Sequence, residues 1–112
     1  MVSRILQLLC ILALLTPAHA QIVAYMAIVK KDGSANAMQF VDACVTNIKQ
    51  SNRKALNPIV AAIRYSENGK AGKEFGILHK RCPNTFRGQA GWCAATVQKN
   101  YDRWLRTKPK EC

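Results

Sequence analysis

Acidic residues and histidines are scarce in this sequence, and their scarcity excludes much of enzyme chemistry. The 112 residues contain 6 acidic residues and 2 histidines, against 17 basic residues. Acid–base catalysis of the kind that secreted nucleases use requires two imidazoles, or an imidazole and a carboxylate, beside a cationic cleft. The acidic residues are scattered, and no two of them lie at metal-ligand spacing on one face of a predicted helix. We therefore expect a protein that is not an enzyme and that binds neither a metal ion nor a cofactor.

Sequence motifs for nucleotides, glycans and zinc are also missing. Gly69, Gly72 and Gly76 do not have the spacing of a phosphate-binding loop. No asparagine is followed at the second position by the Ser or Thr that N-glycosylation requires. The cysteines from Cys44 onward are separated by 37, 10 and 18 residues, so they do not form the close pairs that are typical of zinc sites.

The first twenty residues have the composition of a secretory signal peptide. Arg4 gives a short positive region, Ile5–Leu15 is an apolar run, and Ala18–Ala20 is a small-x-small cleavage signature. The alternative is a membrane anchor, because Ile22–Val29 is also apolar and the two stretches together approach the ~20 residues that a span needs. A proline and polar residues between them argue against it. We therefore predict a signal peptide at 1–20, followed by one secreted domain at 21–112 without a transmembrane segment.

Cleavage after Ala20 would change the inventory of reactive residues. Arg4, Cys10 and His19 would leave, so 16 basic residues would face 6 acidic ones, a net charge of +10 on 92 residues. An even number of cysteines in an oxidising compartment indicates two disulfides. A domain of this size gains only marginal stability from its core, so cross-links matter. The four cysteines of the mature chain are Cys44, Cys82, Cys93 and Cys112.

Four cysteines allow three pairings, and helix geometry separates them. Bridged Cα atoms lie within about 7 Å of each other. Cys93 begins a predicted helix that is about 15 residues, or about 22 Å, long, and Cys112 lies beyond its far end, so a Cys93–Cys112 bridge is disfavoured. The other pairings are Cys82–Cys93 with Cys44–Cys112, or Cys44–Cys93 with Cys82–Cys112. We prefer the first because the segment 83–92 contains two glycines and can loop back easily.

Three segments carry the periodicity of amphipathic helices. The first spans 37–50, with Asn36 as its expected N-cap. The second starts at Asn57 and Pro58, a capping residue followed by proline, and stops near Gly69. The third spans 91–107. We expect its apolar stripe to be buried against the other helices: Cys93, Val97, Tyr101, Trp104 and Leu105.

Two segments have no clear periodicity. Ile22–Val29 is apolar on all sides, and we favour a helix over a buried strand because alanines and a methionine occur in it and Gly33 is a plausible terminator. The segment from Lys70 to Gly88 contains five basic residues among its glycines and a proline, so we expect a long basic loop, with Phe75–Leu78 as a short strand or turn on the core. The resulting prediction is a mainly α fold: a small disulfide-stabilised bundle of three to four helices with a long basic loop.

The basic residues gather in that loop and on the outer face of the last helix. A strong positive charge favours anionic partners, although a lysine-rich surface also keeps a protein soluble. Trp92 falls on the helix face that carries Lys99 and Arg103, where an exposed tryptophan suits a receptor or a lipid headgroup; alternatively, it packs against the loop that ends at Cys93. The candidate contact residues are Lys70, Lys73, Lys80, Arg81, Arg87, Trp92, Lys99, Arg103 and Arg106.

Charge without catalytic residues predicts a secreted binding protein. The leading hypothesis is a non-enzymatic cationic protein that binds an extracellular receptor or an anionic glycan or lipid surface; nucleic acid is not the expected partner of a secreted protein. The alternatives are a host-defence protein that acts on anionic membranes and a carrier of a small apolar ligand, for which Ile22–Val29 would help to line the site. His79, the one histidine of the mature chain, is interpreted as a surface residue.

Overall fold

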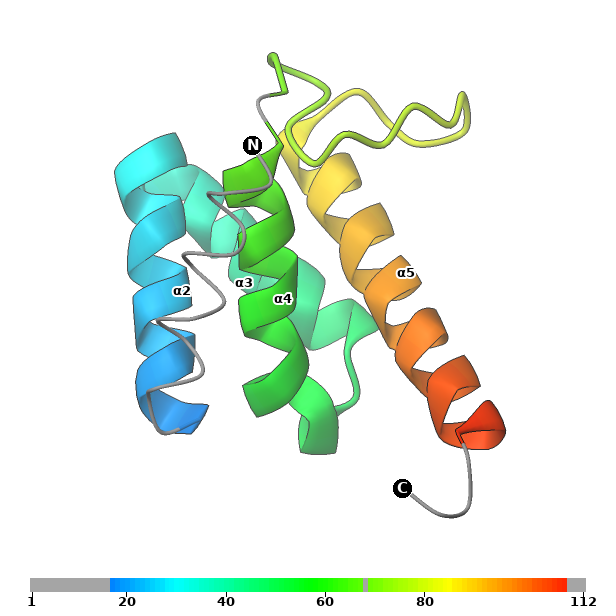
Figure 1. Ribbon diagram of the computed structural model, residues 1–112. Helices are drawn as coiled ribbons and strands as arrows, with labels where there is room; N and C mark the ends of the chain where they lie inside the picture. Colours follow the sequence, from blue (N-terminus) through cyan, green and yellow to red (C-terminus); the bar gives the residue numbers. More distant parts are fainter. Residues whose placement is uncertain (1–16, 68, 109–112) are drawn as a thin grey trace.

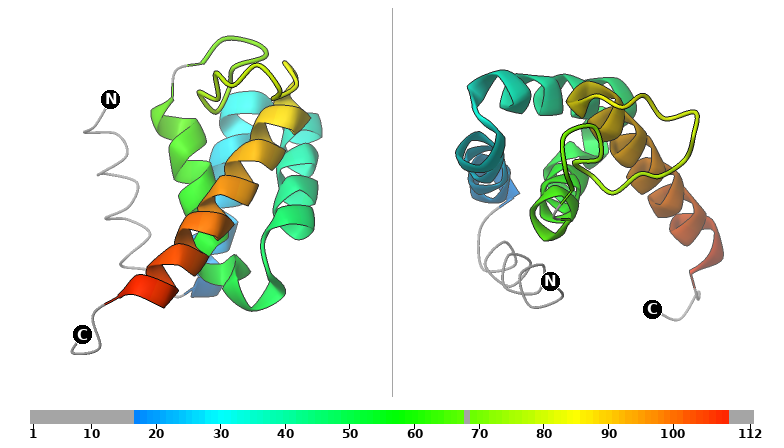
Figure 2. Two further views of the ribbon diagram at one scale, coloured as in Figure 1. Left: turned by 90° about the vertical axis from the view of Figure 1, so that its right-hand side faces the viewer. Right: turned by 90° about the horizontal axis from the view of Figure 1, so that it is seen from above.

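The computed structural model describes residues 17–67 and 69–108, which form a bundle of four α-helices (Figure 1). Helix α2 packs against α4 and α3 packs against α5, so that α2 and α5 lie on opposite sides of the molecule (Figures 1 and 2). These residues contain no strand, which confirms the mainly helical prediction. The elements are α2 (Pro17–Asp32), α3 (Ser34–Asn47), the 3-10 helix η1 (Gln50–Asn52), α4 (Arg53–Ser66) and α5 (Phe86–Thr107).

The apolar segment Ile22–Val29 is helical, as the composition favoured, and it lies within α2. Gly33 ends this helix with a φ of 88°, a conformation that glycine adopts without strain. Its N–H donates to the Val29 carbonyl and its own carbonyl accepts from the Ala37 N–H, so one residue ends α2 and begins α3. Helix α3 therefore starts before Asn36, and the prediction that Asn36 caps it was wrong.

Helix α2 also extends to the N-terminal side of the predicted segment. It begins at Pro17, where the fixed φ of proline suits a first helical position. Ala20 lies in the first turn and is buried in the bundle. The expected cleavage position after Ala20 thus falls inside a helix of this structure.

Helix α4 begins at Arg53, five residues before Pro58, and this start corrects the predicted one. The Arg53 guanidinium donates to the carbonyls of Val45 and Ile48, and in this way it satisfies groups at the end of α3. Pro58 lies buried inside the helix, where its missing N–H removes one hydrogen bond. Asn57 is consequently not a cap, and its side-chain oxygen has no hydrogen-bond partner.

Helix α5 begins at Phe86, five residues before the predicted start. Thr85 is its N-cap, and the Thr85 Oγ1 accepts from the Gly88 N–H at 3.0 Å. The last turns of α5 project beyond the other helices (Figure 2). Trp104 is therefore 54% exposed and Leu105 is 42% exposed, so the prediction that both are buried was wrong.

The core contains many alanines, which allow the helices to approach closely. Larger apolar side chains fill the space between the helices. The buried core residues include Ala24, Ile28, Ala37, Phe40, Ala43, Cys44, Ile48, Leu56, Val60, Ala61, Phe75, Phe86, Ala90, Cys93 and Ala94.

No disulfide joins the cysteines in the described part of the chain. Cys44, Cys82 and Cys93 are buried free thiols, and Cys112 lies outside the described residues. Any set of two bridges among the four would join two of the three described cysteines, so the structure does not have the expected two-bridge framework. The preferred Cys82–Cys93 bridge is absent, and the Cys82 Sγ accepts a hydrogen bond from the Gln89 Nε2 at 3.4 Å.

Candidate anion-binding surface on the last helix

The connection between α4 and α5 contains turns but no helix or strand over residues 69–85, and Gln89 of α5 fixes its middle. The Gln89 side chain is fully buried. Its Oε1 accepts from the N–H groups of Phe75 (3.2 Å) and Ile77 (3.0 Å), and its Nε2 donates to the Ile77 carbonyl (2.9 Å). The Phe75 ring is also buried and meets the Phe86 ring edge-on, with centroids 5.4 Å apart. This part of the connection therefore follows a fixed path along α5.

A buried ion pair fastens the start of the same connection. The Arg64 guanidinium forms two bonds with the Asp32 carboxylate, Nη2–Oδ1 at 2.5 Å and Nε–Oδ2 at 2.8 Å. Both side chains are less than 10% exposed. The remaining Nη1 donates to the Glu74 carbonyl at 2.9 Å. One side chain thus joins the ends of α2 and α4 to the connection.

The fixed path places His79 against Trp92. Their rings are stacked, with centroids 5.0 Å apart and planes inclined by 27°. The His79 Nδ1 accepts from the Arg81 N–H at 3.1 Å, which holds the imidazole in this turn. Trp92 is half-buried as a result. The stacking partner, His79, lies before Cys82 and therefore outside the loop against which Trp92 was expected to pack.

A hollow of about 420 Å³ opens next to Trp92. Four of the α5 residues that line it are small (Gly88, Gly91, Ala95 and Thr96), and Asn47 of α3 lines the opposite side. At Gly91, for example, an added Cβ would lie 3.6 Å from the Asn47 amide nitrogen, so an alanine would fit and would narrow the hollow. The lining residues are Asn47, Pro83, Gly88, Gly91, Trp92, Ala95, Thr96 and Lys99.

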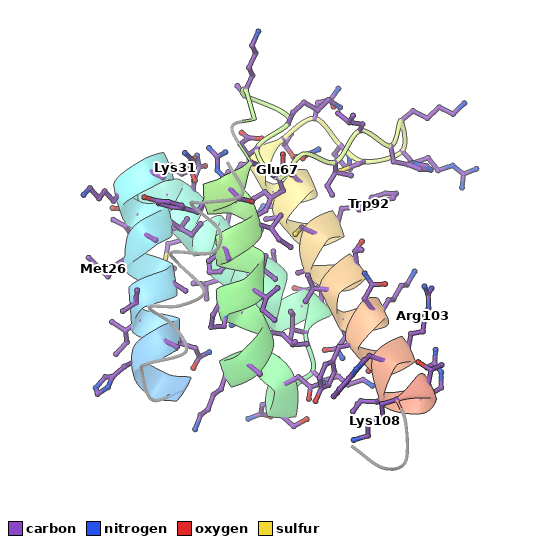
Figure 3. All side chains as sticks on the ribbon, viewed as in Figure 1. Met26, Lys31, Glu67, Trp92, Arg103 and Lys108 are labelled. Atoms are coloured by element: carbon purple, nitrogen blue, oxygen red, sulfur yellow. The ribbon has the colours of Figure 1, made fainter. Side chains whose placement is uncertain are left out.

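Three of the predicted contact residues follow this hollow along α5. Lys99, Arg103 and Arg106 are exposed and are spaced by four and three residues, so they share one face of the helix. Within residues 17–67 and 69–108, none of the three is within ion-pair distance of a carboxylate. Figure 3 shows Trp92 and Arg103 pointing to the same side of α5. The structure therefore brings an aromatic pair and a row of cations onto one surface.

The other predicted contact residues are distributed over the connection and the start of α5. Lys80 and Arg81 are exposed and adjoin His79, so they lie beside the aromatic pair. Lys73 donates from Nζ to the Asn84 Oδ1 at 2.8 Å, and Arg87 forms an exposed ion pair with Asp42 at 3.5 Å. Lys70 is exposed near the start of the connection.

The sequence reasoning missed the residues at the projecting end of α5. Trp104 was expected in the core, but its ring is exposed. The Lys108 Nζ lies over this ring in a cation–π contact, 5.3 Å from the ring centroid. The signal that could have revealed this is length. At 1.5 Å per residue a helix of 22 residues is about 33 Å long, whereas one of 14 residues is about 21 Å long, so α5 must extend beyond α3 and α4.

The buried thiols do not provide a nucleophile in this arrangement. Burial raises the pKa of Cys44 from 9.0 to about 12, and the charge of the neighbouring Cys93 contributes in the same direction. Burial likewise raises the pKa of Cys93 to about 12, with a smaller contribution from Glu67. Burial also raises the pKa of Cys82. Each of these thiols therefore holds its proton at neutral pH.

The described ranges contain neither a metal-binding cluster nor a membrane-spanning helix. No group of three or more His, Cys, Asp or Glu residues there could hold a metal ion. None of the helices in those ranges combines the length and the apolar character needed to cross a membrane.

Comparison with known proteins finds no matching family model, no matching curated protein and no matching solved structure.

Proposed function

We propose that this protein is a non-enzymatic, secreted cationic protein that binds an anionic surface through the outer face of α5. The observation that carries the proposal is the row of Lys99, Arg103 and Arg106, which has no acidic partner in the described residues and which continues from the stacked Trp92 and His79. Unpaired cations on one face attract polyanions from a distance, and a half-buried tryptophan beside them supplies contact area.

A sulfated glycan chain suits this surface. The residues from Lys99 to Arg106 extend for about 10 Å along the helix axis at 1.5 Å per residue. Lys80 and Arg81 continue the positive charge past His79 onto the connection. A linear polyanion can therefore follow α5 and meet several cations in succession, whereas a single small anion would use only one of them.

Heparin affinity tests the proposal. We expect the variant with Lys99→Gln and Arg103→Gln to bind heparin about tenfold more weakly than the natural protein, a difference of ~1.4 kcal/mol. The matched control carries Lys30→Gln and Lys54→Gln, which remove the same charge from exposed positions on α2 and α4. We expect the control to elute from a heparin column at nearly the same salt concentration as the natural protein. Equal weakening in both variants would mean that only net charge matters and would contradict a specific α5 surface.

A second function, attack on anionic membranes, is favoured by the projecting end of α5. Trp104 and Leu105 are exposed beside Arg103, Arg106 and Lys108, and this combination is typical of helices that bind at a membrane interface. Dye release distinguishes the two functions. A membrane-active protein releases dye from vesicles that contain phosphatidylglycerol at micromolar concentration, whereas a glycan-binding protein leaves them intact while it binds heparin.

The proposal includes secretion, which is supported by Arg4, the apolar run Ile5–Leu15 and the cleavage signature Ala18–Ala20. N-terminal sequencing of exported protein should begin at Gln21, and an intact Met1 would contradict this part of the proposal. For the exported protein we also propose stabilisation by a disulfide that includes Cys112, since the three described thiols are not joined to one another. Peptide mapping without reduction tests that bridge.

A further inference from the structure

His79 makes two contacts that depend on the charge of its ring. The imidazole stacks on the Trp92 indole with centroids 5.0 Å apart. Its Nδ1 accepts a hydrogen bond from the Arg81 N–H at 3.1 Å, so the Nδ1 carries no proton in this arrangement. The same turn is closed by a second bond, from the Cys82 N–H to the His79 carbonyl at 2.9 Å. His79 therefore connects the backbone of residues 79–82 to the aromatic end of the basic row on α5.

A proton on the Nδ1 affects these two contacts in opposite directions. An imidazole changes its charge between about pH 5 and pH 8, and in the charged form both ring nitrogens are donors. The Nδ1–H then faces the Arg81 N–H, so the hydrogen bond between them is lost. The stack is strengthened, because the face of an indole attracts a cation that lies over it. Protonation therefore keeps the ring on Trp92 and releases the backbone N–H of Arg81.

The charges around His79 link its protonation to the binding of an anion. The basic residues that flank the aromatic pair are Lys80 and Arg81 on the connection and Arg87 and Lys99 on α5. Carboxylates of the neighbouring elements have other partners: Asp42 of α3 pairs with Arg87 at 3.5 Å, and the Glu74 Oε1 accepts from the Gly72 N–H at 3.0 Å. In residues 17–67 and 69–108 no carboxylate lies within ion-pair distance of His79. A positive charge on this ring is therefore opposed by its neighbours in the free protein and stabilised by a bound polyanion.

We propose that protonation of His79 releases the turn at residues 79–82 and strengthens the binding of a sulfated glycan to the outer face of α5. The effect presupposes the proposed function, because the glycan lies on the same face of the helix. The charged ring adds a cation at the Trp92 end of the basic row, and the released Arg81 N–H is a further donor for a sulfate oxygen. Since linkage is reciprocal, the proton favours the glycan by the factor by which the glycan favours the proton. The affinity for the glycan therefore increases as the pH falls.

Heparin affinity at two pH values tests this link. The sulfate and carboxylate groups of heparin stay ionised between pH 7.5 and pH 5.5, so a change in affinity reports on the protein. We expect the natural protein to bind heparin about three- to fivefold more tightly at pH 5.5, the effect of one added charge contact at a surface. His79→Gln should bind with nearly the same affinity at both pH values.

The matched control is His19→Gln in the full-length chain. His19 is the other histidine of the sequence and lies exposed on α2, so this variant should keep the full increase in affinity at pH 5.5. An equal increase in the natural protein and in both variants would overturn the assignment to His79.

A pH titration without heparin tests the turn itself. In a Trp104→Phe background Trp92 is the only tryptophan, and an imidazolium that stacks on an indole quenches its fluorescence. We expect this fluorescence to fall between pH 7.5 and pH 5.5, and the NMR signal of the Arg81 backbone amide to shift over the same range. Neither change should occur when His79→Gln is added. If the natural ring produces neither change, the proposal is overturned, whatever the heparin affinity does.

The two measurements separate this proposal from the proposed function. A clear titration of Trp92 and Arg81 without tighter heparin binding at pH 5.5 would overturn the link between His79 and the glycan. Undiminished heparin binding by the variant with Lys99→Gln and Arg103→Gln would contradict the proposed function, and with it the glycan-binding part of this proposal. The titration without heparin would in that case still show whether the turn is released.

Discussion

The loop end of the bundle and the far end of α5 are held in opposite ways. At the loop end, where α4 connects to α5, two buried side chains make six hydrogen bonds. Arg64 forms two with the Asp32 carboxylate and one with the Glu74 carbonyl, and Gln89 forms three with backbone groups of Phe75 and Ile77. At the far end, α5 projects beyond its neighbours, and its charged contact is the exposed Lys49–Asp102 pair at 3.3 Å. The first arrangement gives a fixed path to the segment that carries His79. The second leaves aromatic and basic side chains accessible to a partner.

The largest expected effect is a difference in stability between variants of the two ion pairs, the buried Arg64–Asp32 pair at the loop end and the exposed Lys49–Asp102 pair at the far end. Arg64→Met leaves the Asp32 carboxylate buried without its cation, and we expect the free energy of unfolding to fall by about 3–5 kcal/mol. Lys49→Met removes one member of an exposed pair, and we expect a change below about 1 kcal/mol. Urea denaturation at pH 7 measures both. A double variant, Arg64→Met with Asp32→Leu, should recover much of the loss, and equal losses in the two single variants would remove the distinction between the ends.

The second prediction concerns the buried contact between α3 and α5, which contains the thiols of Cys44 and Cys93 and is examined at alkaline pH. The folded-state pKa values of Cys44 and Cys93 are about 12, above the value of 9.0 for a free thiol. As the pH rises, the thiols of the unfolded chain therefore lose their protons before those of the folded chain. The free energy of unfolding is unaffected by these thiols below pH 9 and decreases as the pH rises from 9 toward 12. At pH 10.5 we expect a loss on the order of 2 kcal/mol for each thiol in the reduced protein.

Urea midpoints between pH 8 and pH 11 check this dependence. The Cys93→Ala variant should lose less stability over that range than the natural protein, because one of the two buried thiols is gone. A parallel decline in both proteins would show that other groups, such as lysines, cause the alkaline loss.

The smallest effect compares the two tryptophans of α5. Trp92→Ala removes the stacking partner of His79, and we expect a loss of about 1 kcal/mol. Trp104→Ala at the exposed end should change the free energy of unfolding by less than about 0.5 kcal/mol. Thermal unfolding followed by circular dichroism measures the difference. A larger loss for Trp104→Ala would mean that the projecting end contributes to folding after all.

Sequence periodicity predicted the helices well and their ends poorly. The apolar faces located α3 and α5, because burial on one side of a helix leaves a repeating pattern. The starts were wrong at Asn36 and Asn57, where a residue that often caps a helix lies inside one. The real ends depend on tertiary contacts, such as the bonds from Arg53 to the end of α3, and no local pattern records these.

The candidate surface was predictable in part. The spacing of Lys99, Arg103 and Arg106 placed them on one face without any structure. The stack of His79 on Trp92 was not predictable, because it depends on Gln89 directing a segment that has no periodicity. The exposure of Trp104 was also missed, since a helical wheel describes the faces of a helix but not where its neighbours end.

The bonds of Gln89 have a consequence for how this protein can vary. Its amide bonds main-chain atoms of Phe75 and Ile77 and contacts one side chain, the buried Cys82 Sγ at 3.4 Å, so these bonds do not depend on the exposed side chains between Ile77 and Cys82. No other side chain combines an accepting oxygen with a donating nitrogen at this reach. Substitutions at Leu78, Lys80 or Arg81 should therefore leave the backbone course intact, so the exposed side chains of this segment can change while the scaffold stays the same.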